Sequence, residues 1–157
     1  MTLLKLAIGL GLLMVAGSAA VAQAQQGEAA SDDKDRPCTP EDLVGRYMIV
    51  SGEKYGMPEP EERIKGTIVT FTKDSVVVAD KDKKELYSAN YKLGSKKNPA
   101  DIIMTSKVES SAGEEARGLI KKEGETLHLI YALPTGEIPT GFKTKEKQLM
   151  FVMKKAE

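Results

Sequence analysis

The stretch TLHLIYAL, residues 126–133, and the stretch QLMFVMKK, residues 148–155, carry the clearest strand signals in the chain. Both are short and rich in aliphatic and aromatic side chains, the composition that a pleated, half-buried surface favours. The segment between them, PTGEIPTGF (134–142), contains Pro and Gly pairs that indicate a connection. The sequence upstream repeats short strands and turns, so we expect a sheet that grows hairpin by hairpin.

Six further strands are predicted upstream of this stretch. They are Val44–Ser51, Ile64–Thr72, Ser75–Ala79, Glu85–Leu93, Asp101–Val108 and Ala116–Lys122. Residues 52–62 contain two Gly and two Pro and are predicted to be a loop. Before the first strand, Thr39–Leu43 has Thr at the N-cap and Pro at the first helical position, so one helical turn is expected, with Leu43 packed inward.

Eight short strands without an amphipathic helix predict an antiparallel all-β domain. An up-and-down barrel of eight strands leaves no open edge, and its interior either fills with side chains or holds one small ligand. A two-sheet sandwich is the alternative. The consecutive short connections favour the barrel, which we place at residues 39–157.

The N-terminus predicts export. Lys5 precedes an apolar run, Leu6–Ala16, and two A-x-A sites follow at 20–22 and 22–24. This order is typical of a secretory signal peptide, and the run is too short to anchor the chain in a bilayer. Residues 1–24 are therefore predicted to be the signal peptide and residues 25–38 a disordered linker, which makes the mature protein periplasmic or extracellular with no stable membrane anchor.

Charge and cysteine content narrow the function. Removal of residues 1–24 takes away Lys5 and no acidic residue, which leaves one more acidic than basic side chain. A nearly neutral surface argues against nucleic-acid binding. Cys38 is the only cysteine and lies in a polar segment, where we expect an exposed free thiol, with a disulfide to another chain as the alternative.

No catalytic, metal or cofactor site is predicted. His128 is the only histidine, and no serine or cysteine motif pairs with it as a nucleophile. A single histidine also forms no ligand cluster for zinc or copper. The segment Asp80–Asp82 lacks the Gly and Glu of a calcium loop, so we expect a solvated turn. Five carboxylates on predicted loops and strand ends are expected to be solvated: Glu59, Glu61, Glu62, Glu85 and Glu137. We expect a non-enzymatic protein.

Several polar side chains on strands remain candidates for a ligand site. His128 lies on the face opposite Leu127 and Leu129 and is expected to face solvent. Arg46 and Arg117 are expected on the outer face, and either one inside the barrel would indicate an anionic ligand. Four tyrosines are candidates either to line a pocket or to pack in the core: Tyr47, Tyr87, Tyr91 and Tyr131.

Two sets of motifs resemble known families. The segment Leu43–Tyr47 (LVGRY) resembles the L-x-G-x-W opening of lipocalin-like barrels, with Tyr in place of Trp. There the aromatic residue closes one end, and a basic residue of the last strand packs across it. The resemblance gives that role to Lys154 or Lys155.

The chain from about Asp42 to Lys155 resembles more specifically a paralogous family of secreted, lipocalin-like domains in planctomycete bacteria. The matching segments are KNPADI (97–102), GLIKKEGETL (118–127) and IPTGF (138–142). Three family residues differ: the Trp, a Tyr after the first Gly-Ile, and an Arg before the Pro. The resemblance implies fold and export and assigns no catalytic residue.

Two functions follow as expectations. The first is a barrel that binds a small apolar or amphipathic ligand. The second is a filled barrel that acts as an interaction module of the cell envelope and contacts protein or polysaccharide. The scarcity of large rings, with no Trp and three Phe, leaves room for a cavity. Four methionines, however, are adaptable fillers: Met48, Met104, Met150 and Met153.

Overall fold

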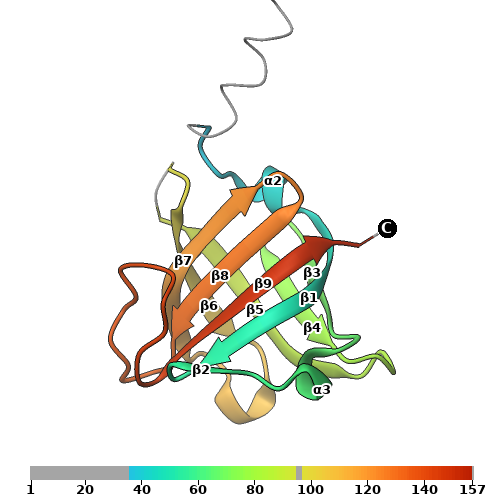
Figure 1. The fold of residues 1–157 in the computed structure, drawn as a ribbon. Helices are drawn as coiled ribbons and strands as arrows, with labels where there is room; N and C mark the ends of the chain where they lie inside the picture. Colours follow the sequence, from blue (N-terminus) through green and yellow to red (C-terminus); the bar gives the residue numbers. More distant parts are fainter. Residues whose placement is uncertain (1–35, 95–96, 157) are drawn as a thin grey trace, which may run out of the picture. The chain divides into compact units, whose positions relative to one another are not determined.

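Strands β1 (Gly45–Lys54) and β9 (Gln148–Lys155), the first and last of the domain, pair antiparallel and close the sheet into a barrel. This is seen in a computed structural model that describes residues 36–94 and 97–156 (Figure 1). The other barrel strands are β3 (Ile68–Phe71), β4 (Ser75–Ala79), β5 (Glu85–Leu93), β6 (Ala100–Ser106), β7 (Glu115–Glu123) and β8 (Thr126–Ala132). Each strand pairs with the next one along the chain, and all pairings are antiparallel. The predicted eight-stranded up-and-down barrel is confirmed.

The predicted loop at 52–62 is wrong in part. Strand β1 continues to Lys54 and pairs there with a two-residue strand, β2 (Met57–Pro58). The turn between them is built on Tyr55 and Gly56, which both have positive φ angles, the geometry of a two-residue hairpin. The sequence did not indicate this hairpin because a tyrosine rarely adopts the positive φ angle that its turn requires.

A single helical turn, α3 (Glu61–Ile64), follows, so the next strand begins later than predicted, at Ile68. Ile64 was predicted to open that strand but is the buried end of α3, and Gly66 then turns the chain at a φ of 80°. A one-turn 3-10 helix, η2 (Glu109–Ser111), connects β6 to β7. No helix among residues 36–94 and 97–156 has the length and apolar character needed to cross a bilayer.

The helical turn before β1 forms as predicted. Helix α2 (Pro40–Leu43) is capped by Thr39, whose hydroxyl and backbone N–H both donate to the Asp42 carboxylate, at 2.7 and 2.9 Å. Leu43 is fully buried. The Lys122 ammonium of β7 donates to the Asp42 carbonyl at 2.7 Å, which satisfies an acceptor at the end of the turn. We call this end of the barrel the α2 end.

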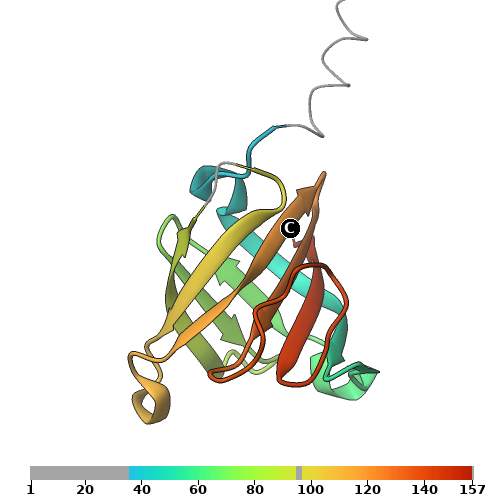
Figure 2. The ribbon, with the colours of Figure 1, turned by 90° about the vertical axis from the view of Figure 1, so that its left-hand side faces the viewer.

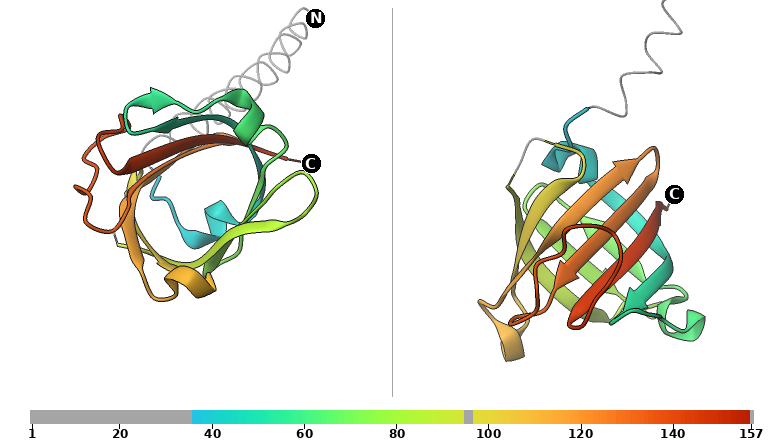
Figure 3. Two further views of the ribbon diagram at one scale, coloured as in Figure 1. Left: turned by 90° about the horizontal axis from the view of Figure 1, so that it is seen from below. Right: turned by 60° about the vertical axis from the view of Figure 1, so that its left-hand side comes forward.

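The opposite end carries four connections and is called here the loop end. They are residues 55–67, 80–84, 107–114 and 133–147. Figures 1 and 2 show α2 at one end and α3 with η2 at the other, and the left view of Figure 3 looks along the barrel axis from the loop end. The ends differ because the turns 72–74 and 124–125 near α2 are tight, whereas the connections 55–67 and 133–147 at the loop end are long.

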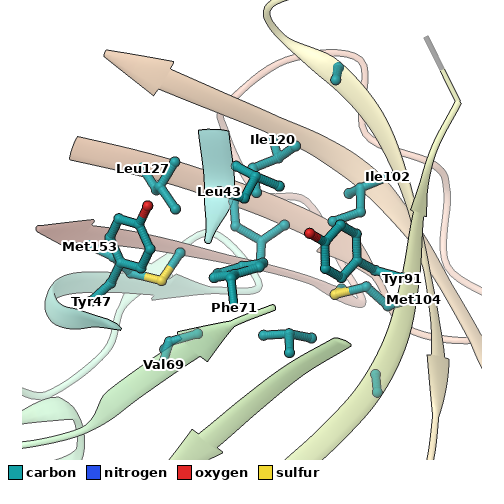
Figure 4. Packing of buried hydrophobic residues seen from close by; sticks show 14 of the residues in the cluster. Leu43, Tyr47, Val69, Phe71, Tyr91, Ile102, Met104, Ile120, Leu127 and Met153 are labelled. Atoms are coloured by element: carbon teal, nitrogen blue, oxygen red, sulfur yellow. The ribbon is translucent and has the colours of Figure 1, made fainter. Parts of the chain in front are cut away.

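Large side chains fill the interior at the α2 end. Phe71 stands edge-on between Tyr47 and Tyr91, with ring centroids 5.9 and 5.7 Å apart (Figure 4). Around these rings pack Leu43, Ile102, Ile120, Leu127 and Met153. The Tyr91 hydroxyl donates to the Thr72 carbonyl at 2.6 Å, whereas the fully buried Tyr47 hydroxyl has no hydrogen-bond partner among the described residues.

One glycine allows β7 and β8 to approach closely. A Cβ atom on Gly118 would lie 1.8 Å from the Ile130 carbonyl oxygen and 2.7 Å from the Tyr131 Cα. No side chain fits there without movement of the backbone of β8. Gly118 therefore permits the close approach of the two strands, and it is the first residue of the family-like segment 118–127.

The predicted signal peptide (1–24) and most of the predicted linker (25–38) lie outside the described residues. Cys38, however, was expected to be an exposed thiol in that linker, and this is wrong. Only 4% of its surface is exposed, and its N–H donates to the Lys97 carbonyl at 3.2 Å. The folded unit begins at Pro37. Burial of the sulfur also disfavours a disulfide to another chain.

Candidate functional site

An apolar cavity of about 180 Å³ occupies the barrel toward the loop end. Its wall takes Ile49 rather than Tyr47 from β1, Tyr87 rather than Tyr91 from β5, and Leu129 rather than Leu127 from β8, so it lies away from α2. The other lining residues are Val69, Val76, Val78, Met104, Tyr131, Phe151 and Met153. Every one of the ten side chains is aliphatic, aromatic or a methionine.

The cavity exists because its wall on β3 and β4 consists of valines, which are smaller than the rings packed at the α2 end. Val69, Val76 and Val78 line one wall, from the neighbouring strands β3 and β4. Opposite the cavity's Phe151, β1 places Gly52, where an added Cβ would be only 3.1 Å from the phenyl ring. A valine wall leaves space that the two methionines, Met104 and Met153, do not fill, so a cavity remains in the interior.

Tyr87 and Tyr131 carry the polar groups of the cavity. Both residues are partly exposed, and in the described part of the chain neither hydroxyl has a hydrogen-bond partner. Burial raises the pKa of Tyr87, and the Glu114 carboxylate raises it further. Burial also raises the pKa of Tyr131, with smaller contributions from Tyr87 and Tyr55. Both phenols are thus neutral hydrogen-bond donors at physiological pH.

Of the four candidate tyrosines, the structure brings two to the cavity and two to the packed end. Tyr87 and Tyr131 line the cavity, while Tyr47 and Tyr91 flank Phe71. Strand alternation placed all four inside the barrel. It did not separate them, because the level of each ring along the axis depends on strand register.

Arg46 and Arg117 are both exposed, as expected for the outer face. Arg117 donates to Glu115 at 3.2 Å, on the same strand and the same face. The cavity therefore has no guanidinium to pair with an anionic ligand.

His128 also lies on the outer face, as predicted, but it is half-buried. The loop 133–147 brings Phe142 edge-on to the imidazole, with ring centroids 6.1 Å apart, and Lys121 lies over the same phenyl ring at 5.3 Å. Burial lowers the pKa of His128, and the positive charge of Lys121 lowers it further against the opposing effect of Glu123. His128 is neutral at pH 7 and helps to hold the loop on the barrel.

The loop 133–147 is fastened to the end of β1 at the loop end of the barrel. Both the N–H and the hydroxyl of Thr144 donate to the Glu53 carboxylate, the former at 3.0 Å. The same hydroxyl accepts from the Gly56 N–H at 2.8 Å. These bonds lower the pKa of Glu53. Gln148 is buried, and its side chain donates to the Glu137 carbonyl at 2.6 Å and accepts from the Lys145 N–H at 2.8 Å.

The acidic residues considered from the sequence do not come together in a common site among the described residues. Asp80 accepts from the N–H groups of Asp82 and Lys84 at 2.9 and 3.0 Å, which confirms the turn at 80–82. Of the five predicted solvated carboxylates all but Glu59 are exposed, and Glu59 lies 3.8 Å from Arg63. In residues 36–94 and 97–156, no three His, Cys, Asp or Glu side chains gather as ligands for a metal ion.

The expectation of a basic residue packed across Tyr47 is met in its position but not in its burial. Lys155 lies opposite Tyr47 in the β1–β9 register, and both its Cε and the tyrosine ring flank Gly45. Lys155 and Lys154 are nevertheless exposed. Tyr47 itself lies beneath α2, at the end it was expected to close.

No protein-family model matches the chain, and neither the curated proteins nor the solved structures contain a match to it.

Proposed function

We propose that this protein is a non-enzymatic binding protein that holds a small apolar molecule, or the apolar end of an amphipathic one, in the barrel. The cavity carries this proposal, because well-packed cores contain few voids larger than a water molecule. An engineered apolar cavity of about 150 Å³ stays dry and binds benzene. A cavity of about 180 Å³ is thus suited to one ring or a short chain. It is smaller than the roughly 300–1,000 Å³ of drug-sized sites.

The proposal includes export and membership of the secreted, lipocalin-like family in planctomycete bacteria. The motifs that resemble this family coincide with structural needs of the barrel. Gly45 and Tyr47 begin β1 beneath α2, Gly118 gives the close approach of β7 and β8, and Phe142 fastens the loop 133–147. Detection of a mature N-terminus near residue 25 in the medium or periplasm tests the export, and an intact Met1 there or retention in the cytoplasm contradicts it.

A pair of valines on β4 allows a matched binding test. Val78 lines the cavity, and Val77, its neighbour, points to the outer face. Toluene is titrated by NMR into the wild type and into Val78→Phe and Val77→Phe. We expect Val78→Phe to weaken binding by about tenfold or more, equivalent to 1.4 kcal/mol, because the new ring occupies the cavity. Equal affinity of the two variants would refute the site, and absence of binding by the wild type would refute the function.

A second function is supported by apolar side chains on the outer face. Met48 and Val50 of β1 are 44% and 45% exposed, and Met57 of β2 is 69% exposed. Large apolar side chains exposed on the outer face, such as the pair Met48 and Val50 two residues apart on β1, favour a contact site and thus an interaction module of the cell envelope. Binding to isolated envelope fractions should fall in a Met48→Ser, Val50→Ser double variant while toluene binding is unchanged. Unchanged envelope binding would exclude this surface.

A further inference from the structure

The chemistry of the cavity wall restricts the ligand further, an inference that rests on the proposed function. An apolar wall accepts an apolar body of any kind, so selectivity depends on the few polar atoms that the wall presents. Tyr87 and Tyr131 are the two lining residues whose side chains carry an oxygen. The two residues come from different strands, β5 and β8, and both line the same cavity.

Both hydroxyls are available to a ligand. Tyr91 provides the comparison within the same barrel, since its hydroxyl is already bonded to the Thr72 carbonyl at 2.6 Å. No such bond is made by Tyr87 or Tyr131 within the described residues, and neither hydroxyl is sealed from solvent. A phenol that is neutral at physiological pH donates one hydrogen bond and accepts others, so the pair suits a ligand hydroxyl or carbonyl.

An anionic ligand does not suit this wall. Burial of a carboxylate in an apolar site is costly unless a cation and hydrogen bonds compensate it. The two arginines on which such a site would depend, Arg46 and Arg117, are on the outer face. The negative charge that acts on Tyr87 comes from Glu114, which opposes a second negative charge.

We infer that the cavity selects uncharged ligands that carry one hydroxyl or carbonyl group, and that Tyr87 and Tyr131 are its specificity-determining residues. The apolar body occupies the space between β4 and β8–β9, and its polar atom lies at the level of the two tyrosines. A fatty-acid carboxylate or a phosphate ester is excluded by the same wall.

Three single-ring ligands test this inference: toluene, phenol and benzoate at pH 7, each titrated by NMR or calorimetry. The proteins are the wild type, a Tyr87→Phe, Tyr131→Phe double variant, and Tyr91→Phe as the control with a bonded hydroxyl. We expect the double variant to lose about tenfold in phenol affinity, the upper range for neutral hydrogen bonds. Its toluene affinity should change by less than about twofold, and Tyr91→Phe should retain phenol binding.

The outcomes separate the inference from the function on which it rests. Toluene binding together with equal phenol affinity in wild type and double variant overturns the role of the tyrosines and leaves the binding function intact. Benzoate that binds as tightly as phenol overturns the selection against charge. If neither toluene nor phenol binds the wild type, the proposed function fails and this inference fails with it.

Discussion

Two tyrosines in the packed end of the barrel should respond in opposite directions to loss of the hydroxyl. Tyr47 and Tyr91 both flank Phe71 at nearly equal ring distances, and both are almost completely buried. They differ in one respect: the Tyr91 hydroxyl donates to Thr72, whereas the Tyr47 hydroxyl has no partner among the described residues. Tyr→Phe substitution removes only the oxygen, so the pair isolates the hydrogen bond.

The expected magnitudes follow from these contacts. A net hydrogen bond contributes about 0.5–1.5 kcal/mol, so Tyr91→Phe should lower the free energy of unfolding by about 1 kcal/mol. A buried hydroxyl without a partner costs about 1–3 kcal/mol. Tyr47→Phe should therefore raise the free energy of unfolding by about 1 kcal/mol or more, and the two variants should differ by about 2 kcal/mol.

Urea unfolding, followed by far-UV circular dichroism, measures both variants against the wild type. The slope of the transition should be equal in all three, because the surface exposed on unfolding is the same. If Tyr47→Phe is destabilised as much as Tyr91→Phe, the Tyr47 hydroxyl has a partner and the reasoning about the packed end is wrong. The raised pKa of Tyr91, to about 12, adds a check, since spectrophotometric titration should show this phenol ionising late.

Three further predictions concern single positions. Gly118→Ala should lower the free energy of unfolding by about 3 kcal/mol or more, because its Cβ would meet the Ile130 carbonyl. The control is Gly141→Ala, which has open space around it and should change the free energy of unfolding by less than about 0.5 kcal/mol. Equal effects of the two substitutions in urea unfolding would contradict the close approach of β7 and β8. The folded-state pKa of Glu53 is lowered by Thr144, so this carboxylate stabilises the fold above its unfolded pKa of about 4.5 and the benefit is lost as pH falls through the lower folded value. The stability advantage of wild type over Glu53→Gln should thus shrink in acid, and a pH-independent difference would refute the linkage. Cys38 should resist a thiol reagent in the native protein and react on unfolding, because its sulfur is buried and burial raises the pKa of the thiol. Rapid labelling of Cys38 in the native protein would contradict its place in the core.

The strand pattern could be predicted from the sequence because a barrel strand requires inward apolar and outward polar side chains in alternation, which many different residues can supply. Ser75–Ala79, Glu85–Leu93 and Gln148–Lys155 have the predicted bounds, and the pairing of β1 with β9 follows from the strand count. The helical turn was equally clear, since Thr39 and Pro40 act through local geometry alone.

The errors arise where tertiary contacts override local signals. Cys38 lies in a polar sequence, yet the backbone at Lys97, far along the chain, holds it in the core. Tyr55 adopts a positive φ that its side chain disfavours, and the hairpin with β2 depends on it. No local pattern marked either contact.

The cavity was the least predictable feature. Composition left room for one, but the choice between a filled barrel and one with a cavity depends on the height of each side chain along the axis. Val78 of β4 lies opposite Tyr87 of β5 at the cavity, whereas Phe71 of β3 lies opposite Val76 and contacts the rings of Tyr47 and Tyr91. Strand register sets these levels, and it becomes visible only when the barrel closes.

The location of a bound molecule tests the central claim most directly. Intermolecular nuclear Overhauser effects between toluene and assigned methyl groups should appear at Leu129, Val78 and Ile49, which line the cavity. They should be absent at Ile120 and Leu43, which lie in the packed end. Contacts confined to outer residues such as Met48 and Val50, or no contacts at saturating toluene, would contradict a ligand-holding barrel.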